Sequence, residues 1–308
     1  MILSAGLTPA WQQILVFDQV CWGEVNRAGE VAWCGSGKVL NAGMAAHRLG
    51  SPSLTLAPLG GSPLMEIDRE FADLGAPRRW IETRAATRVC TTILDRSTGQ
   101  ITELVENGRP LEEAELAAFR AAYAEEAARA EVAVLIGSLP SGVPPSLYRD
   151  LVARTRCPMV LDFRGDGLLS VLDLKPYVVK PNREELGQTF GRSLDDDAEL
   201  LAAMRQLNRL GAQWVVVTQG AKTVWVSSSE RAYRLMPPRV AEVVNPIGCG
   251  DCLAAGIAGA TRRGDSIVDA VRFGIGAAGD NLGKLLPCRL EREKVANLAN
   301  QVSVDRIA

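Results

Sequence analysis

Short, continuous apolar runs recur through the second half of the chain, and segments that favour helix separate them. Such a run is typical of a strand that is buried on both faces of a sheet. The predicted strands are Val132–Ile136, Met159–Asp162, Tyr177–Lys180 and Trp214–Thr218. The predicted helices are Ala114–Ala130, Pro145–Arg154 and Asp195–Leu210, the last ending at Gly211. This alternation predicts a central, mostly parallel sheet flanked by helices, in a three-layer α/β fold.

The first third of the chain has a different pattern, because its strands follow one another without long helices between them. The predicted strands are Ile14–Val20, Gly29–Trp33, Thr87–Asp95 and Ile101–Val105, and they flank a helix at Val39–Leu49 and a strand at Ser53–Leu59. We expect two antiparallel hairpins that form a small β lid, with lid strands at about 10–35 and 87–106. The chain is expected to be one domain over residues 1–308.

Composition narrows the class of protein. The 308 residues are 47% hydrophobic, enough for a large core, and the net charge of −2 does not indicate binding to nucleic acid or an anionic membrane. No uncharged apolar run reaches the length of a membrane-spanning helix. Met1–Gly6 reads as a first strand and not as a signal peptide. Seven irregularly spaced cysteines favour free thiols and a cytoplasmic location.

The most informative segment is Gly248-Cys249-Gly250-Asp251, which precedes a long apolar run. It reads as a glycine-rich turn that opens a helix, where unpaired backbone N–H groups and the helix dipole attract an anion such as phosphate. Asp251 would lie beside that anion, placed to accept a proton from an attacking hydroxyl. The alternative is a glycine turn whose aspartate only caps the helix.

Several motifs, taken in order, resemble those of the ribokinase-like (PfkB) carbohydrate kinases, in their phosphofructokinase and tagatose-phosphate kinase branch. The similarity covers about residues 2–290. The matching segments are Gly37-Lys38-Val39-Leu40-Asn41-Ala42, Gly137–Pro144, Lys180-Pro181-Asn182-Arg183-Glu184-Glu185, Val217–Gly220 and the turn Gly248–Asp251. The resemblance implies a ribokinase-like fold and an ATP-dependent kinase that phosphorylates a sugar or sugar phosphate, with ketohexose phosphates favoured.

The resemblance also implies roles on the nucleotide side of the site. Asp251 is the general base, and the backbone of Gly248, Cys249 and Gly250 stabilises the charge that develops on the phosphoryl group. ATP is expected to contact Lys180, Asn182, Glu185, Thr218 and Gly220, and Mg²⁺ is expected near Asn182 and Glu185. The alternative for Asn182 and Glu185 is a capping box, because an Asn followed three residues later by a Glu also caps a helix.

On the acceptor side, the resemblance implies substrate contacts from Gln12, Gly37, Lys38, Asn41, Arg88 and Ser138. Two positions depart from the family pattern. Gln12 stands where the family has an aspartate that contacts sugar hydroxyls, and Val39 replaces a glycine that would line the sugar pocket. These changes leave open a kinase for an unphosphorylated sugar or nucleoside, and a non-catalytic sugar or nucleotide sensor on the same fold. A homodimer through the lid is a further expectation.

Three other features are given structural interpretations. Gly37-Lys38 lacks the Ser/Thr and the glycine spacing of a P-loop. Cys249 and Cys252 form a CxxC without a second such pair, so we expect them to pack as small residues at a helix start. His47, the single histidine, has no predicted partner and is expected to be structural.

Overall fold

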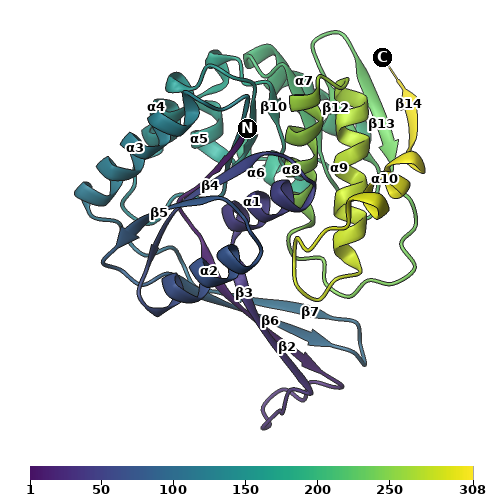
Figure 1. Ribbon diagram of the computed structural model, residues 1–308. Coiled ribbons are helices and arrows are strands. Elements are labelled where there is room, and N and C mark those ends of the chain that lie inside the picture. The colour runs from purple at the N-terminus through teal and green to yellow at the C-terminus, as the bar shows by residue number, and fades with distance from the viewer. Residues whose placement is uncertain (308) are drawn as a thin grey trace.

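The structure, a computed structural model, describes residues 1–307 and contains two separate β-sheets (Figure 1). The larger sheet has ten strands in the order β14-β13-β12-β11-β10-β9-β8-β1-β4-β5. Its strands are β1 (Ile2–Ala5), β4 (Ser53–Gly60), β5 (Arg78–Thr83), β8 (Val132–Ile136), β9 (Met159–Asp162), β10 (Val178–Val179), β11 (Trp214–Val217), β12 (Val224–Ser227), β13 (Ala232–Met236) and β14 (Ser303–Arg306).

The pairing in this sheet is parallel from β5 to β11, as the sequence predicts, and antiparallel from β11 to β14. The antiparallel edge was not predicted. The predicted strand at Tyr177–Lys180 is limited to Val178–Val179.

Helices cover both faces of the large sheet and give three layers. One face packs against α1 (Lys38–Arg48), α2 (Ser62–Asp73), α8 (Cys249–Arg263), α9 (Ile267–Leu282) and α10 (Arg292–Asn300). The other packs against α3 (Glu113–Ala127), α4 (Ser146–Arg154), α5 (Gly165–Leu169), α6 (Arg183–Thr189), the short helix η1 (Leu172–Leu174) and α7 (Asp197–Leu210).

Strand β8 illustrates how one apolar run serves two cores. Val132, Val134 and Ile136 belong to the core beneath α1 and α8, whereas Ala133 and Leu135 belong to the core beneath α3 and α4. Successive side chains of a strand point to opposite faces, so a strand between two helical layers must be apolar throughout. The continuous apolar runs therefore correctly predicted the three-layer fold.

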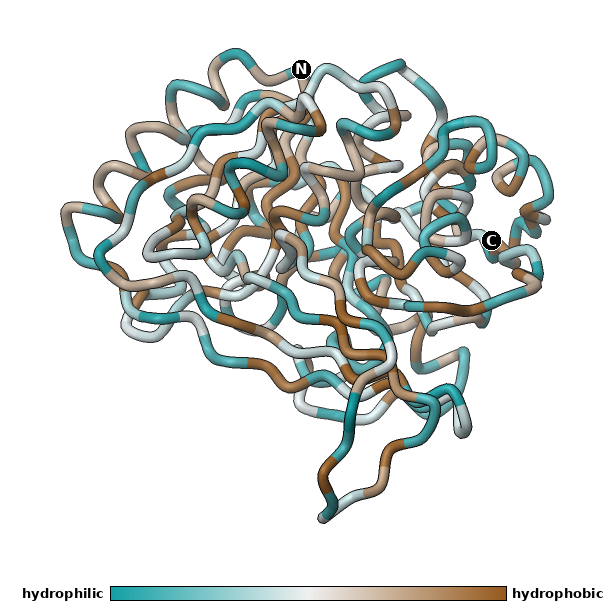
Figure 2. The backbone as a smooth tube through the Cα atoms, turned by 60° about the horizontal axis from the view of Figure 1, so that its bottom comes forward, coloured by the Kyte–Doolittle hydropathy of each residue, from teal (hydrophilic) through white to brown (hydrophobic). Residues whose placement is uncertain are grey.

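The smaller sheet has four strands in the order β3-β2-β6-β7, with β2 (Ala10–Phe17), β3 (Glu30–Ser36), β6 (Arg88–Asp95) and β7 (Ile101–Val105). Both predicted antiparallel hairpins are present, and parallel pairing of β2 with β6 joins them. Strand β2 begins and ends earlier than predicted, because alternating burial starts at Ala10 and Asp18 is already exposed. Figure 1 shows the strands of this sheet projecting from the body of the molecule, and this end of the molecule comes forward in Figure 2.

Within residues 1–307, none of the helices combines the length and the apolar character needed to cross a membrane.

Candidate active site

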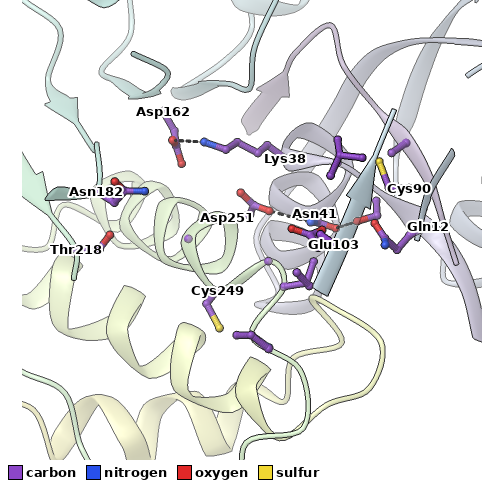
Figure 3. A pocket seen from close by; sticks show the side chains of 18 of the residues that line it. Gln12, Lys38, Asn41, Cys90, Glu103, Asp162, Asn182, Thr218, Cys249 and Asp251 are labelled. Carbon is purple, nitrogen blue, oxygen red and sulfur yellow. Dashed lines mark hydrogen bonds and ion pairs between the residues drawn. The ribbon is translucent and has the colours of Figure 1, made fainter. Parts of the chain in front are cut away.

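A cavity of about 500 Å³ lies where the small sheet meets the main body (Figure 3). Its walls come from the small sheet, the start of α1, the ends of β9 to β11 and the start of α8. They include every site residue predicted from the sequence except Ser138: Gln12, Gly37, Lys38, Asn41, Arg88, Lys180, Asn182, Glu185, Thr218, Gly220 and Gly248–Asp251. Residues separated by up to 239 positions in the sequence thus share one cavity because parallel strands end at the same edge of the sheet.

The glycine-rich turn forms the N-terminus of α8. Gly248 is the residue before the helix and has a φ of 83°, and a Cβ there would lie only 3.0 Å from the Sγ of Cys288. Both the backbone conformation and the packing therefore favour glycine. Within the described residues, the backbone N–H groups of Gly250 and Asp251 have no hydrogen-bond partner. Two unpaired donors at the start of a helix form an anion cradle.

Two buried asparagines hold this turn from behind. The Nδ2 of Asn245 donates to the Leu285 carbonyl at 2.8 Å, and its Oδ1 accepts from the Ile247 N–H at 3.0 Å. The Nδ2 of Asn281 donates to the Ile247 carbonyl at 2.8 Å, and its Oδ1 accepts from the Cys288 N–H at 2.6 Å. Both side chains are fully buried. They fix the direction in which the turn presents its N–H groups, a role that sequence reasoning missed.

Asp251 lies at the bottom of the cavity and is 6% exposed. Its Oδ2 accepts a hydrogen bond from the Nδ2 of Asn41 at 2.8 Å. Burial raises the pKa of Asp251 to about 6, although the nearby Lys38 lowers it. The carboxylate is therefore mostly ionised at neutral pH but more basic than an ordinary aspartate, which suits a general base.

A cluster of the partly exposed Lys38 with the buried Lys180 and Asp162 forms another wall of the cavity. Asp162, at the end of β9, accepts from the Nζ of Lys38 at 3.0 Å and from the Nζ of Lys180 at 2.8 Å. Burial raises the pKa of Asp162, but the two lysines outweigh it and lower that pKa. Burial opposes the charge of Lys38, yet Asp162 and then Glu185 raise the pKa of its ammonium group. The lowered pKa of Asp162 and the raised pKa of Lys38 keep both of these groups charged. Asp162 was not predicted as a site residue. The signal that could have identified it is a polar residue at the end of a buried parallel strand, where ligand sites form.

Asn182 and Glu185 form the capping box that the sequence left as an alternative. The Oδ1 of Asn182 accepts from the Glu185 N–H at 2.7 Å, and the Oε2 of Glu185 accepts from the Asn182 N–H at 2.9 Å. The other oxygen of Glu185 lies 3.6 Å from the Nζ of Lys38, beside the cavity. Within residues 1–307, no three His, Cys, Asp or Glu side chains gather as a metal cage.

On the side of the small sheet, two predicted contacts are already engaged with protein groups. The Nε2 of Gln12, which is 2% exposed, donates to the Oγ1 of Thr92 at 2.7 Å. Arg88 donates to three backbone carbonyls, those of Thr8 at 3.1 Å, Pro9 at 3.3 Å and Glu106 at 2.9 Å. A guanidinium has five N–H donors, so Arg88 retains two for a ligand.

Two expectations for this side of the site need correction. Val39 does not narrow the cavity: it is 1% exposed, belongs to the core beneath α1, and lies against Gly6. Its side chain packs into the core and not into the cavity, whereas Lys38 and Asn41 on the same helix line the cavity. Ser138 lies outside the cavity lining, where its backbone carbonyl accepts from the Oγ1 of Thr8 at 3.2 Å.

A second, apolar cavity of about 910 Å³ adjoins the first. Thr218, Gly220, Cys249 and Gly250 line both cavities, and the walls of the second include Val224, Leu253, Ile275 and Leu282. An apolar slot beside a cationic cluster and an anion cradle can hold a flat ring that is joined to an anionic tail.

The remaining cysteines and the histidine have structural positions. Cys252 is fully buried, and its Sγ lies 3.4 Å from that of Cys288. The seven cysteines, all within residues 1–307, are free thiols. His47 contacts the Leu74 carbonyl through its Nε2 at 2.9 Å.

Comparisons with known proteins agree with this architecture. The sequence model of the pfkB family carbohydrate kinases matches residues 13–285. A Thermotoga maritima structure described as a possible 1-phosphofructokinase has a TM-score of 0.90 at 20% identity and covers 100% of this chain and 99% of its own. The tetrameric inhibited form of Escherichia coli phosphofructokinase-2 has a TM-score of 0.87 at 22% identity, covering 97% and 98% of the two chains. The same Escherichia coli enzyme in complex with substrates and products has a TM-score of 0.85 at 24% identity, covering 96% and 98%.

Proposed function

Because the chain belongs to the pfkB family of carbohydrate kinases, we propose that it transfers the γ-phosphoryl group of ATP to a hydroxyl of a ketohexose phosphate. The observation that carries this proposal is the buried Asp251 carboxylate, with a pKa raised to about 6, at the mouth of an anion cradle. Seven free thiols favour a reducing compartment such as the cytoplasm.

In the proposed reaction, Asp251 accepts the proton of the acceptor hydroxyl as its oxygen attacks the γ-phosphorus, and the bond to the leaving ADP oxygen breaks. The N–H groups of Gly250 and Asp251 donate to the phosphoryl oxygens as charge develops on them. Lys38 and Lys180 supply positive charge on the opposite side, held in place by Asp162. The apolar cavity beside Thr218 and Gly220 receives the base of the nucleotide.

The residues beside the phosphate position fit a magnesium ion of the usual enzymatic kind. Mg²⁺ typically keeps several waters and contacts one or two carboxylates together with substrate phosphates, without a dedicated protein cage. Glu185 has one oxygen that is not part of the capping box and lies beside the cavity. When bound, Mg²⁺ would neutralise charge on the transferred phosphates. Glu185 would hold it directly or through water.

The acceptor class rests on two features. The segment Gly137–Pro144 resembles that of kinases for ketohexose phosphates, and Arg88, which lines the cavity, has two unused N–H donors. The engagement of Arg88 with three carbonyls favours a second candidate, a kinase for an unphosphorylated sugar.

A coupled assay of ADP release tests both candidates. The panel contains fructose 1-phosphate, fructose 6-phosphate, tagatose 6-phosphate, fructose and ribose, each with ATP and Mg²⁺. We expect the highest kcat/KM with a sugar phosphate. Turnover of the free sugars alone would favour the second candidate. ATP binding without any turnover on the panel would contradict a kinase and leave a sensor.

We further propose that the small sheet acts as a lid and that two copies of the chain pair through its outer face. That face exposes Val31 by 52%, Trp33 by 42% and Leu104 by 53%. Exposed apolar groups on one sheet face are typical of an interface. Light scattering should give twice the chain mass of 33.0 kDa, and Trp33→Lys should halve it. Met236→Lys, at an exposed apolar position on the large sheet, is the matched control. A monomeric wild type would contradict the pairing.

A further inference from the structure

Glu103, on the inner face of the small sheet, is the one carboxylate of the cavity lining without a protein partner in the described residues. Asp162 contacts two lysines, Glu185 caps α6, and Asp251 accepts from Asn41. Glu103 lines the same cavity and forms neither a hydrogen bond nor an ion pair within residues 1–307. A carboxylate that faces a cavity with all its acceptor capacity unused is available to a ligand.

Strand register places Glu103 close to Gln12. On β6, Thr92 pairs with Glu103 of β7, and this same Thr92 accepts the hydrogen bond from the Nε2 of Gln12. Gln12 pairs with Cys90 of β6, which is two residues from Thr92 and therefore on the same face of the strand. The three side chains thus lie on one face, and Figure 3 shows Glu103 and Gln12 on the same side of the cavity. The amide donor of Gln12 is occupied, so this residue offers a ligand only a neutral oxygen.

Arg88 and Glu103 mark opposite ends of this face. Arg88 and Thr92 are four residues apart on β6, which corresponds to about 13 Å along the strand, and Glu103 lies beside Thr92. A phosphorylated sugar can therefore direct its anionic group toward Arg88 while its hydroxyls approach Glu103. Glu103 is exposed to solvent where it lines the cavity; partial burial of its carboxyl raises its pKa, and Arg88 lowers it.

We propose that Glu103 is a specificity-determining residue that accepts hydrogen bonds from acceptor hydroxyls, supplying the negative charge that residue 12 lacks. This inference rests on the proposed kinase function. It identifies the acceptor class as a polyhydroxy compound that carries its hydroxyls at the end remote from Arg88. Charged hydrogen bonds are about twice as strong as neutral ones, so a lid carboxylate can replace one on β2.

The test compares Glu103→Gln with the wild type on fructose 1-phosphate, fructose 6-phosphate and tagatose 6-phosphate. We expect the acceptor KM to rise at least about tenfold, because a charged hydrogen-bond acceptor is lost. The KM for ATP should change less than twofold and kcat less than threefold. Glu24→Gln, an exposed carboxylate in the β2–β3 loop outside the cavity lining, is the matched control and should change neither KM.

A second variant asks whether the charge itself matters. Gln12→Asp added to Glu103→Gln restores a carboxylate on the same face of the sheet, from β2 on the other side of β6, and should recover at least fivefold of the lost acceptor affinity. Wild-type turnover with an unchanged acceptor KM in Glu103→Gln would overturn this inference and leave the kinase assignment intact. A parallel rise in the KM for ATP would also overturn it. A wild type that phosphorylates nothing on the full panel would overturn the proposed function and this inference with it.

Discussion

Replacing the proposed base, Asp251, with asparagine should inactivate the protein and stabilise its fold. Asparagine resembles the protonated aspartate in shape, and its Oδ1 can still accept from the Nδ2 of Asn41. The substitution therefore removes mainly a buried negative charge. Loss of a general base lowers kcat by about 10²–10⁴.

The size of the stabilisation follows from the pKa of Asp251. Burial raises that pKa from 3.8 to about 6, so the folded protein prefers the protonated form. At 1.36 kcal/mol per pH unit, keeping the ionised form buried costs about 3 kcal/mol at neutral pH. The free-energy cost of burying the ionised carboxylate is absent below pH 3.8 and grows as the pH rises toward 6. Above pH 6 it reaches its full value. At pH 5 about half of it remains.

Urea unfolding of the wild type and Asp251→Asn at pH 7.5 and pH 5.0 measures this cost directly. We expect the variant to be more stable by about 3 kcal/mol at pH 7.5 and by about half as much at pH 5.0. If the stability difference between the variant and the wild type is the same at both pH values, the charge of Asp251 is not its cause. A variant less stable than the wild type at pH 7.5 would refute the reasoning, because the carboxylate would then contribute to the fold.

Three further predictions concern activity and packing. Because protonated Asp251 cannot act as a base, kcat/KM should fall tenfold per pH unit below about pH 6 and stay constant above pH 6. A value of kcat/KM that is constant from pH 5 to 8 would argue against Asp251 as the base. Asn281→Ala should lower kcat at least about tenfold while the KM values for ATP and acceptor change less than threefold, because the glycine-rich turn loses its support. The control Asn297→Ala, at an exposed position, should leave kcat and both KM values unchanged. Equal kinetics in the two variants would show that Asn281 does not support the turn. Val39→Gly should lower the free energy of unfolding by about 2–4 kcal/mol without lowering the acceptor KM, because Val39 fills the core. A lower acceptor KM would show that the Val39 side chain reaches the cavity.

The sequence predicted those parts of the fold and site that depend on local signals. Apolar runs such as Val132–Ile136 identify strands buried on both faces, and their alternation with helices gave the layers. Gly248 and Asp251 lie at a helix start, so the glycine-rich turn that opens α8 could be found from four consecutive residues. The same holds for Asn182 and Glu185, although one pattern describes both a ligand site and a capping box, and only the hydrogen bonds revealed the box.

What sequence reasoning missed depends on contacts between distant segments. The packing of Cys252 against Cys288 has no local pattern, and neither do the bonds that join Asn281 to Ile247 before the turn and to Cys288. Glu103 looks like one of many exposed strand residues until register places it beside the cavity. Val39 was misjudged because position in a motif does not reveal the direction of a side chain, which the rotation of α1 decides.

The position of β1 in the large sheet has a consequence for the synthesis of the chain. Strand β1 is fully buried between β4 and β8, and its Ile2 pairs with Val132. At about 5–20 residues per second, a ribosome needs roughly 7–25 s to make the chain between these partners. During that interval the nascent protein presents an apolar strand edge with no neighbour, a template for pairing with other chains. The edge of β1 that β8 covers in the folded protein therefore stays open to pairing with other chains until β8 has emerged.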